Sequence, residues 1–261
     1  MKALLSVSFG TSYEETRAKT IDVIDGKLAA DFPDRAFYSA WTSGRIVSKI
    51  RAERGEMHYT LDEVFARLVH DGVDDLLVAT MCLMNGHEMK KIAEYVEAWV
   101  RGGEGRTAYL AEPILTSEAD RKAIAASLND EFADVPADEA VLLMGHGSPG
   151  GPNEVYSQIQ DDLAALDGTR FFMGTVEGEP TFEDALGLLK ASGVHRVHLA
   201  PFMVVAGDHA RNDLSGADED SWQNRLEAEG FETVVSLRGL GEFKAFQDLV
   251  CVHARTAPVM E

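Results

Sequence analysis

Two long segments of the chain resemble each other, and this internal similarity constrains the fold more than any single motif. Residues 60–90, "TLDEVFARLVHDGVDDLLVATMCLMNGHEMK", align without a gap with residues 181–211, "TFEDALGLLKASGVHRVHLAPFMVVAGDHAR", at a constant shift of 121 positions. The segments "ALLSVSFGTS" (3–12) and "AVLLMGHGSP" (140–149) also align, at a shift of 137. Similarity over a whole strand–helix–strand segment indicates a duplicated unit, although six identities in 31 positions are weak support alone.

The two shifts differ by 16 residues, so the first half should contain an insertion, which we place around "SGRIVSKIRAERGEMH" (43–58). A real repeat predicts two similar parallel-sheet domains that face each other across a cleft, with ligand-binding loops from both. Pro113 and the polar stretch "DVPADE" (134–139) bracket the crossover. We therefore expect an N-terminal domain at residues 1–133 and a C-terminal domain at residues 134–241, with the reactive residues in the second.

Short apolar runs alternate with longer helical patterns along the whole chain. This order predicts an α/β fold in which parallel sheets are covered by helices on both faces. Among the helices, one long pattern spans Tyr13–Phe32 and another spans Asp218–Glu229. The expected strands are Ala3–Ser8, Ala36–Trp41, Asp75–Met81, Thr107–Ala111, Ala140–Met144, Arg170–Val176, Val197–Phe202 and Thr233–Ser236.

The composition excludes several classes of protein. The formal net charge is −20, from 44 acidic and 24 basic residues, which argues against nucleic acid and membrane surfaces as partners. Cys82 and Cys251 are far apart and form no CxxC pair, so neither a disulfide framework nor a thiolate zinc site is expected. The apolar stretch before Gly10 is shorter than most secretory signals, and no run approaches membrane-spanning length, so we expect a cytoplasmic protein.

A histidine lies between two glycines in "LLMGHGSPGG" (142–151), directly after an apolar run. In an open α/β sheet the carboxyl ends of the strands bind ligands. Comparison of the two halves finds reactive side chains in the second copy alone: His146 replaces Phe9, His209 replaces Glu88, and Glu177 faces Thr42 at an approximate shift of 135. Two imidazoles and a carboxylate at three strand ends suit a divalent first-row metal ion.

Each of these residues also has a purely structural interpretation. His146 could be a turn residue that hydrogen-bonds the backbone, and Glu177 could be an acid at a helix start. His209 could form a simple ion pair with Asp208 or Asp213, or Asp208 could orient its ring as a metal ligand. Packed or solvated roles are expected for His58, His70, His195, His198 and His253.

Several motifs resemble the anaerobic cobaltochelatases of the CbiK type, over residues 3 to about 241: "LLSVSFGTSYEET", "MNGHEMKKI", "VLLMGHGS", "GTVEGEPTFED", "LAPFMVVAGDHARND" and "DEDSW". These class II chelatases insert Co²⁺ into sirohydrochlorin in the oxygen-independent route to cobalamin, without ATP. The resemblance implies two Rossmann-like domains with parallel four-stranded sheets, related by pseudo-twofold symmetry, and a C-terminal helix near 242–261 that packs back on the first domain. It also implies that His146, Glu177 and His209 bind the metal, and that no cofactor is needed beyond the substrate ion Co²⁺. Relatives often carry a histidine where this chain has Cys82, which puts any auxiliary role of that position in doubt.

Chelation exchanges two pyrrole protons for one divalent cation, and histidine can serve as ligand or proton acceptor near neutral pH. The tetrapyrrole carries many carboxylates, so its rim should meet basic and amide donors and its face should meet apolar groups. Helical lysines and arginines are more often simply solvated. The candidate contacts are Ser8, Gly10, Thr11 and Ser12, then Arg45 with Lys49, Met84, Lys90 with Lys91 and Arg211, and Val204 with Val205.

Two alternative functions stay open at this point. Insertion of Fe²⁺ or Ni²⁺ into the same tetrapyrrole would use the same donors, because these ions share the ligand preference. A two-lobed protein that binds a small ligand or metal without chemistry would share the fold. The glycines in "GHGSPGG" match neither GxxxxGK[ST] nor GxGxxG, so no nucleotide is expected. We also expect the chain to form a homo-oligomer.

Overall fold

The computed structural model describes residues 1–167 and 171–260. The contacts between residues divide the chain into two compact units, Met1–Thr116 with Phe246–Glu261, and Ser117–Ala245. Each unit is described by itself. Arg170, with which one of the expected strands begins, lies outside the described residues.

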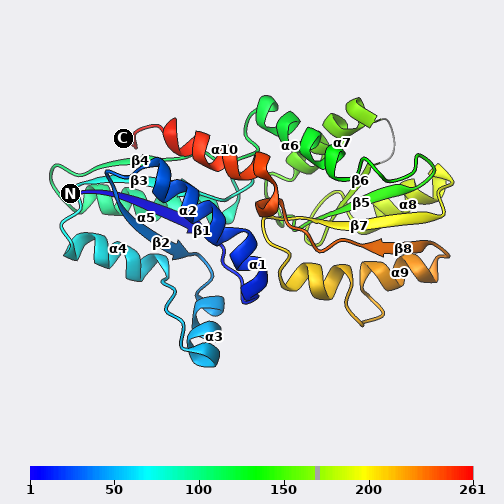
Figure 1. Cartoon of the computed structure of the whole chain (residues 1–261), viewed down its shortest axis with the longest axis horizontal. Helices are drawn as coiled ribbons and strands as arrows, with labels where there is room; N and C mark the ends of the chain where they lie inside the picture. The colour runs from blue at the N-terminus through cyan, green and yellow to red at the C-terminus, as the bar shows by residue number, and fades with distance from the viewer. Residues whose placement is uncertain (168–170, 261) are drawn as a thin grey trace. The chain divides into compact units, whose positions relative to one another are not determined.

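The first unit is built on a four-stranded parallel sheet with the strand order β2-β1-β3-β4 (Figure 1). Neighbouring residues of its central strand, Leu4 and Leu5, are both fully buried, as expected for a parallel sheet covered on two faces. The strands are β1 (Lys2–Ser8), β2 (Ala36–Trp41), β3 (Asp75–Thr80) and β4 (Thr107–Leu110). The helices are α1 (Glu14–Lys19), α2 (Ile21–Asp31), α3 (Gly44–Arg54), α4 (Leu61–His70), α5 (His87–Arg101) and α10 (Lys244–Arg255).

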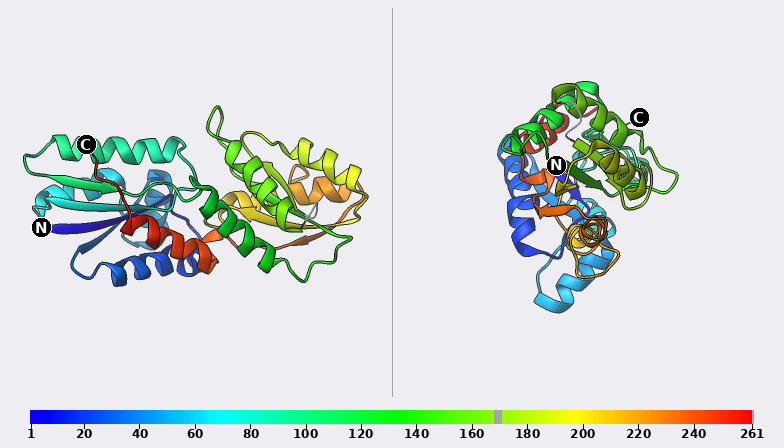
Figure 2. Two further views of the ribbon diagram at one scale, coloured as in Figure 1. Left: turned by 90° about the horizontal axis from the view of Figure 1, so that it is seen from above. Right: turned by 90° about the vertical axis from the view of Figure 1, so that its right-hand side faces the viewer.

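Helices cover both faces of this sheet (Figure 2). Apolar side chains of α4 and α5, among them Val64 and Ile92, pack with Leu5 of β1 in one buried cluster. On the other face α10 lies beside α2, and the Lys27 ammonium of α2 is 2.9 Å from the Asp248 carboxylate of α10. The C-terminal helix therefore belongs to the first unit although it is the last element of the chain.

The second unit repeats this plan with the strand order β6-β5-β7-β8, also all parallel. Leu142 of β5 packs in one buried cluster with Phe182 and Trp222, which come from two different helices. The strands are β5 (Ala140–Gly145), β6 (Phe171–Thr175), β7 (Arg196–Phe202) and β8 (Glu232–Val235). The helices are α6 (Glu118–Glu131), α7 (Glu154–Asp167), α8 (Phe182–Ser192) and α9 (Trp222–Ala228), with a π-helical turn at Ala210–Leu214 and a 3₁₀ turn at Leu240–Glu242.

The strand registers reproduce the repeat seen in the sequence. Ala3 pairs with Leu76 in the first sheet and Ala140 pairs with Val197 in the second, which preserves both shifts, 137 and 121. Each unit also contains an equivalent isolated bridge, Trp41 with Thr60 in one and Thr175 with Thr181 in the other, and the two second members keep the shift of 121. Both threonines then begin a helix through a capping box, with Glu63 and with Asp184. The two halves therefore share their topology and their local capping chemistry.

The insertion of the first half contains α3. Trp41 and Thr60 are nineteen positions apart, whereas Thr175 and Thr181 are six apart, so thirteen of the sixteen extra residues lie here. The register also corrects one alignment. Phe37 of β2 corresponds to Phe171 of β6, a shift of 134, so Glu177 corresponds to Ser43 and not to Thr42.

Other boundaries differ from the sequence expectations. The long helix expected at Tyr13–Phe32 is interrupted at Thr20, whose backbone leaves the helical region (φ −122°, ψ −87°) and whose hydroxyl donates to the Thr16 carbonyl at 2.6 Å. The helix expected at Asp218–Glu229 begins only at Trp222, because the Ser221 side chain caps it there.

The unit boundary also differs from the expected boundary at 133/134, because α6 belongs to the second unit. Arg121 of α6 is 3.3 Å from Asp162 of α7, and the ring of Phe132 contacts Phe171 of β6 edge-on. Among the described residues, no helix combines the length and apolar character that crossing a bilayer requires.

Candidate metal centre

The loop after β5 explains why a histidine lies between two glycines. A Cβ at Gly145 would lie 2.3 Å from the ring of Tyr156, which packs against this turn. Gly147 has a positive φ of 79°, and a Cβ there would lie 2.5 Å from the Glu177 carbonyl oxygen. The Gly147 N–H donates to the Tyr156 hydroxyl at 3.0 Å, and the Glu177 N–H donates to the His146 carbonyl at 2.8 Å. Tyr156 and the end of β6 therefore hold His146 in place.

His209 lies against His146, with ring centroids 4.6 Å apart and planes at 88°. His146 follows β5, and His209 follows β7. In the order β6-β5-β7-β8 these two strands are neighbours at the centre of the sheet. The chain runs from β5 to β6 on one side of this point and from β7 to β8 on the other side. This is the switch point at which open α/β sheets bind ligands. The structure thus brings together two of the three expected metal ligands.

Both imidazoles use Nδ1 for a hydrogen bond inside the unit. His146 Nδ1 lies 2.9 Å from the Gly147 carbonyl oxygen, and His209 Nδ1 lies 2.5 Å from Asp213 Oδ2. A carbonyl or carboxylate oxygen can only accept, so Nδ1 carries the proton in each bond, and in the neutral ring Nε2 keeps its lone pair. Each Nε2 can therefore bind a metal ion or accept a proton.

Glu177 is exposed and does not join the two histidines. Within residues 1–167 and 171–260, no three His, Cys, Asp or Glu side chains are grouped so as to hold a metal ion. The Glu177 backbone is nevertheless hydrogen-bonded to His146, so its side chain starts from the same loop. In this conformation the centre consists of the two imidazoles, and the Glu177 carboxylate belongs to a residue whose backbone is hydrogen-bonded to His146.

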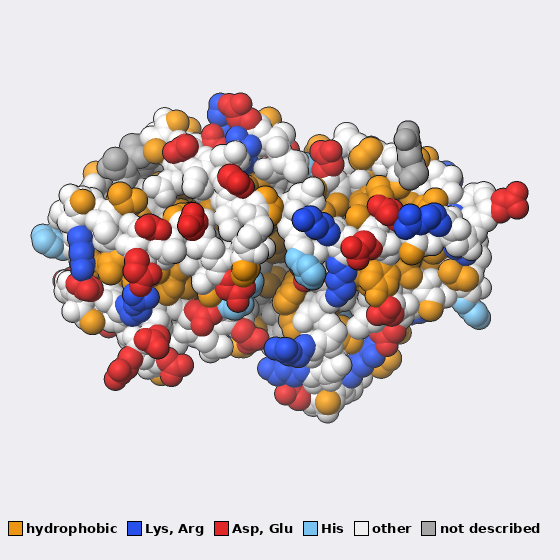
Figure 3. Space-filling view, turned by 180° about the vertical axis from the view of Figure 1, so that it is seen from behind, with side chains coloured by type: hydrophobic (Ala, Val, Ile, Leu, Met, Phe, Trp, Pro, Cys, Tyr) orange, Lys and Arg blue, Asp and Glu red, His pale blue; other side chains and the backbone are white. Residues whose placement is uncertain are grey.

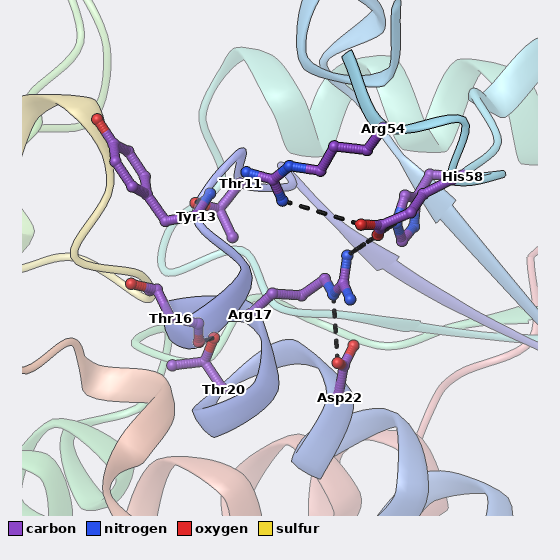
Figure 4. Close-up of polar contacts among 9 residues, drawn as sticks. Thr11, Tyr13, Thr16, Arg17, Thr20, Asp22, Arg54 and His58 are labelled. Atoms are coloured by element: carbon purple, nitrogen blue, oxygen red, sulfur yellow. Dashed lines mark hydrogen bonds and ion pairs between the residues drawn. The ribbon is translucent and has the colours of Figure 1, made fainter. Parts of the chain in front are cut away.

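The turn at residues 8–12 of the first unit is held by a network of charged groups (Figure 4). The Arg54 guanidinium donates to the Ser12 carbonyl at 2.7 Å, and Arg17 donates to Glu56 at 2.6 Å. The His58 imidazole stacks on the Trp41 ring, with ring centroids 3.9 Å apart. Burial lowers the pKa of His58, which favours the neutral ring, and its Nε2 accepts a hydrogen bond from Arg17 at 3.1 Å. This network connects the inserted segment with the turn that we expected to bind substrate.

Three buried polar atoms near the carboxyl end of the first sheet have no hydrogen-bond partner within the part of the chain that the structure describes: Ser8 Oγ, Thr42 Oγ1 and Glu88 Oε2. Thr11 and Ser12 are also buried, and a Cβ at Gly10 would lie 2.6 Å from the Trp41 ring. Buried polar groups without partners are costly, which makes this region of the first unit unusual.

The remaining substrate candidates occupy varied positions. Arg45 and Lys90 are exposed, in the first turns of α3 and α5, and Met84 is half-buried before α5. Val204 and Val205 are half-buried in the loop between β7 and His209. Lys91 is engaged elsewhere, because its ammonium donates to the Thr42 carbonyl at 2.9 Å.

Cys82, His198 and His253 have structural roles, whereas His70 and His195 are exposed. Burial raises the pKa of the Cys82 thiol to about 11, so it stays protonated and is a poor metal ligand. His253 is buried and bonds the Glu112 carbonyl at 3.0 Å, and His198 bonds Glu139 at 2.6 Å. The sequence did not identify Tyr156 or Arg54, because their contacts with Gly147 and Ser12 arise from the tertiary structure and belong to no sequence motif.

The comparison of sequences identifies relatives over nearly the whole length. A model of the cobalt chelatase family CbiK matches residues 2–258. The sirohydrochlorin cobaltochelatase of Salmonella typhimurium (strain LT2) is 35% identical over 258 residues, covering 98% of this chain and 96% of the relative. The sirohydrochlorin cobaltochelatase CbiKC of Nitratidesulfovibrio vulgaris (strain Hildenborough) is 28% identical over 260 residues, covering 98% and 90%.

Solved structures share the fold. SirB from Bacillus subtilis with Fe³⁺ superposes with a TM-score of 0.66 at 15% identity, covering 98% of this chain and 95% of that one. CbiX, described as the terminal enzyme for biosynthesis of siroheme in denitrifying bacteria, gives 0.59 at 18% identity, covering 98% and 100%. At these identities the likeness supports the fold alone. The family match and the Salmonella relative both span nearly the full length, and the chain therefore belongs to the CbiK family of cobalt chelatases.

Proposed function

We propose that this protein inserts Co²⁺ into sirohydrochlorin, without ATP, to give cobalt-sirohydrochlorin for anaerobic cobalamin biosynthesis. The full-length family match and the two relatives named sirohydrochlorin cobaltochelatase support the reaction. The structural observation that carries the proposal is the imidazole pair of His146 and His209 at the switch point of the second sheet. Co²⁺ is the substrate metal, and the proposal needs no resident cofactor.

The proposed metal ligands are His146, His209 and Glu177. Imidazole nitrogen and carboxylate oxygen suit Co²⁺, and the lack of a thiolate favours an affinity low enough for release. To bind the metal ion with the imidazoles, Glu177 has to turn its exposed side chain toward them. Its backbone need not move, because the Glu177 N–H is already hydrogen-bonded to the His146 carbonyl.

Proton balance sets the order of events at these residues. Two pyrrole N–H protons leave sirohydrochlorin as one Co²⁺ enters, so the site must accept two protons for each metal ion delivered. A single Nε2 lone pair binds either Co²⁺ or a proton, so an imidazole becomes a base only after it releases the metal. We assign one proton to a histidine of the pair and the second to Glu177, which passes it to solvent.

The carboxylates of the tetrapyrrole need donors. Within the first unit we propose the turn Ser8, Gly10, Thr11 and Ser12, together with Arg45 and Lys90, as donors, and Met84 as an apolar contact. Within the second unit we propose Val204 and Val205 as apolar contacts close to His209. The unpartnered hydroxyl of Ser8 supports a polar ligand near the turn.

The deciding experiment measures initial rates of cobalt-sirohydrochlorin formation for His146→Ala and His209→Ala. Each should lower the rate by about 100-fold or more, while tetrapyrrole affinity, followed by fluorescence quenching, stays near that of the parent protein. Because the two residues act as a set, the double variant should be little slower than the slower single variant.

The matched control is His195→Ala, which removes an exposed imidazole from the same unit and should leave the rate unchanged. A parent rate for His209→Ala would contradict the mechanism. The same assay with Fe²⁺ or Ni²⁺ in place of Co²⁺ tests the choice of metal, and faster insertion of either would overturn the assignment to cobalt.

A further inference from the structure

The contact between His209 and Asp213 differs in kind from the contact that holds His146. His209 Nδ1 lies 2.5 Å from a carboxylate oxygen of Asp213, whereas His146 Nδ1 lies 2.9 Å from the neutral carbonyl of Gly147. A carboxylate acceptor fixes the Nδ1–H tautomer and makes Nε2 a stronger electron-pair donor. The two imidazoles of the pair are therefore not equivalent.

The backbone after His209 explains why the acceptor is four residues away. Residues Ala210–Leu214 form a π-helical turn, and His209 is the residue before it. Ala210 and Leu214 are completely buried, which anchors both ends of the turn in the core of the second unit. Turns of this rare type recur at functional sites. Here the turn brings the Asp213 carboxylate against the Nδ1 edge of the ring.

The adjacent Asp208, which the sequence offered as an orienting partner, is exposed, and the hydrogen bond goes to Asp213. The side chains of His209 and Asp213 are 39% and 44% exposed, so solvent would screen any charge attraction in the protonated pair. The contribution of Asp213 is therefore mainly one of orientation.

We propose that Asp213 is a positioning residue that fixes the ring and tautomer of His209, so that Nε2 of His209 binds Co²⁺ more tightly than Nε2 of His146 does. This inference rests on the proposed metal role of His209. It predicts an asymmetric pair, in which the carboxylate-backed imidazole is the stronger ligand and the carbonyl-backed imidazole is the weaker.

The test is a titration of the full-length protein with Co²⁺ alone, followed through the visible absorption bands of the bound ion. Asp213→Asn should raise the dissociation constant about 10- to 100-fold, because an amide can donate as well as accept and no longer enforces one tautomer. Asp213→Ala should do the same, and Asp213→Glu, which restores the carboxylate, should recover part of the affinity. His146→Ala should cost less affinity than His209→Ala.

The matched control is Asp208→Asn, which removes the same charge at the residue next to His209. It should leave the dissociation constant for Co²⁺ within about twofold, because the hydrogen bond between His209 and Asp213 is unchanged. The ¹⁵N chemical shifts of the His209 ring are a second readout, which a purely structural role of Asp213 would not change. They should report Nδ1–H in the parent protein and a mixture of tautomers in Asp213→Asn, at an unchanged thermal midpoint of unfolding.

The outcomes separate the two proposals. If His209→Ala binds Co²⁺ as tightly as the parent protein, the metal role of His209 fails. If His209→Ala loses affinity but Asp213→Asn keeps it, the metal role stands and the inference about Asp213 is overturned. Equal losses for Asp208→Asn and Asp213→Asn would also overturn it, because the effect would then be one of charge alone.

Discussion

Asp25 is a buried acid whose replacement tests the electrostatics of the first unit. It lies on α2, and the nearby hydroxyls of Ser6 and Ser39 act to lower the pKa of its carboxyl group. Ser6 and Ser39 are register partners in β1 and β2, so both point to the same face of the sheet. Asp25 Oδ1 is buried and has no hydrogen-bond partner among the described residues. Burial raises the pKa of Asp25 from 3.8 to about 6, and the nearby Asp22 carboxylate contributes in the same direction.

A raised carboxyl pKa makes the folded state less stable as the pH rises. Between about pH 4 and pH 6 the folded protein holds a proton that the unfolded chain has already lost, so the free energy of unfolding falls over this window. A shift of roughly two units corresponds to about 3 kcal/mol, which is fully lost above about pH 7. Because part of the side chain still meets solvent, this value is an upper limit.

Asp25→Asn replaces the carboxyl group with a neutral group of the same size, so it should remove the pH-dependent penalty. We expect its free energy of unfolding to exceed that of the parent protein by up to about 3 kcal/mol at pH 8 and by less than about 1 kcal/mol at pH 4. Urea unfolding followed by tryptophan fluorescence measures both differences. The control is Asp138→Asn, which removes one exposed carboxylate. A loss of stability at pH 8, or equal gains at both pH values, would refute the reasoning.

Three further predictions concern local structure. Gly147→Ala should lower the chelation rate at least about tenfold, because the new Cβ would clash with a backbone carbonyl and a side chain is strained at positive φ. The control is Gly150→Ala, which also has a positive φ but no atom within 4 Å of the new Cβ, and it should keep most of the rate. Cys82→Ser should change the chelation rate less than about threefold, and iodoacetamide should label Cys82 of the parent protein slowly at pH 8, since the thiol pKa is about 11. A nearly inactive Cys82→Ser variant would place chemistry in the first unit. Thr60→Ala and Thr181→Ala should each lower the free energy of unfolding by about 1 kcal/mol, and a cost confined to one of them would show that the two capping boxes are not equivalent.

The sequence predicted the fold because the features that determine it are local and occur twice. The alternation of apolar runs and helical patterns predicted each of the eight strands found in residues 1–167 and 171–260. The two alignment shifts reappear as strand registers, Ala3 with Leu76 and Ala140 with Val197. The glycines of "GHG" marked the loop that carries His146. The predicted fold class is thereby confirmed.

The rest of the site depends on contacts that sequence spacing does not encode. The choice of Asp213 over Asp208 as partner of His209 follows from a π-helical turn, which has no clear sequence signature. The break at Thr20 depends on a hydroxyl bond to the preceding turn. The metal role of His146, Glu177 and His209 stays a prediction, since hydrophobic pattern and strand order place these residues but do not determine what they bind.

The inserted helix α3 also affects how quickly an anionic ligand can arrive. The chain as a whole carries a net charge of −20, which repels a tetrapyrrole whose rim bears carboxylates. Yet α3 holds four cations, Arg45, Lys49, Arg51 and Arg54, against Glu53 alone, and basic side chains gather on the projection to which it belongs (Figure 3). Such a local patch attracts within about 10 Å at 0.1 M salt, beyond which the field is screened. Moderate salt thus suppresses the repulsion at long range while the attraction persists near the helix, so an anionic ligand that comes close to α3 is captured faster than the net charge alone would allow.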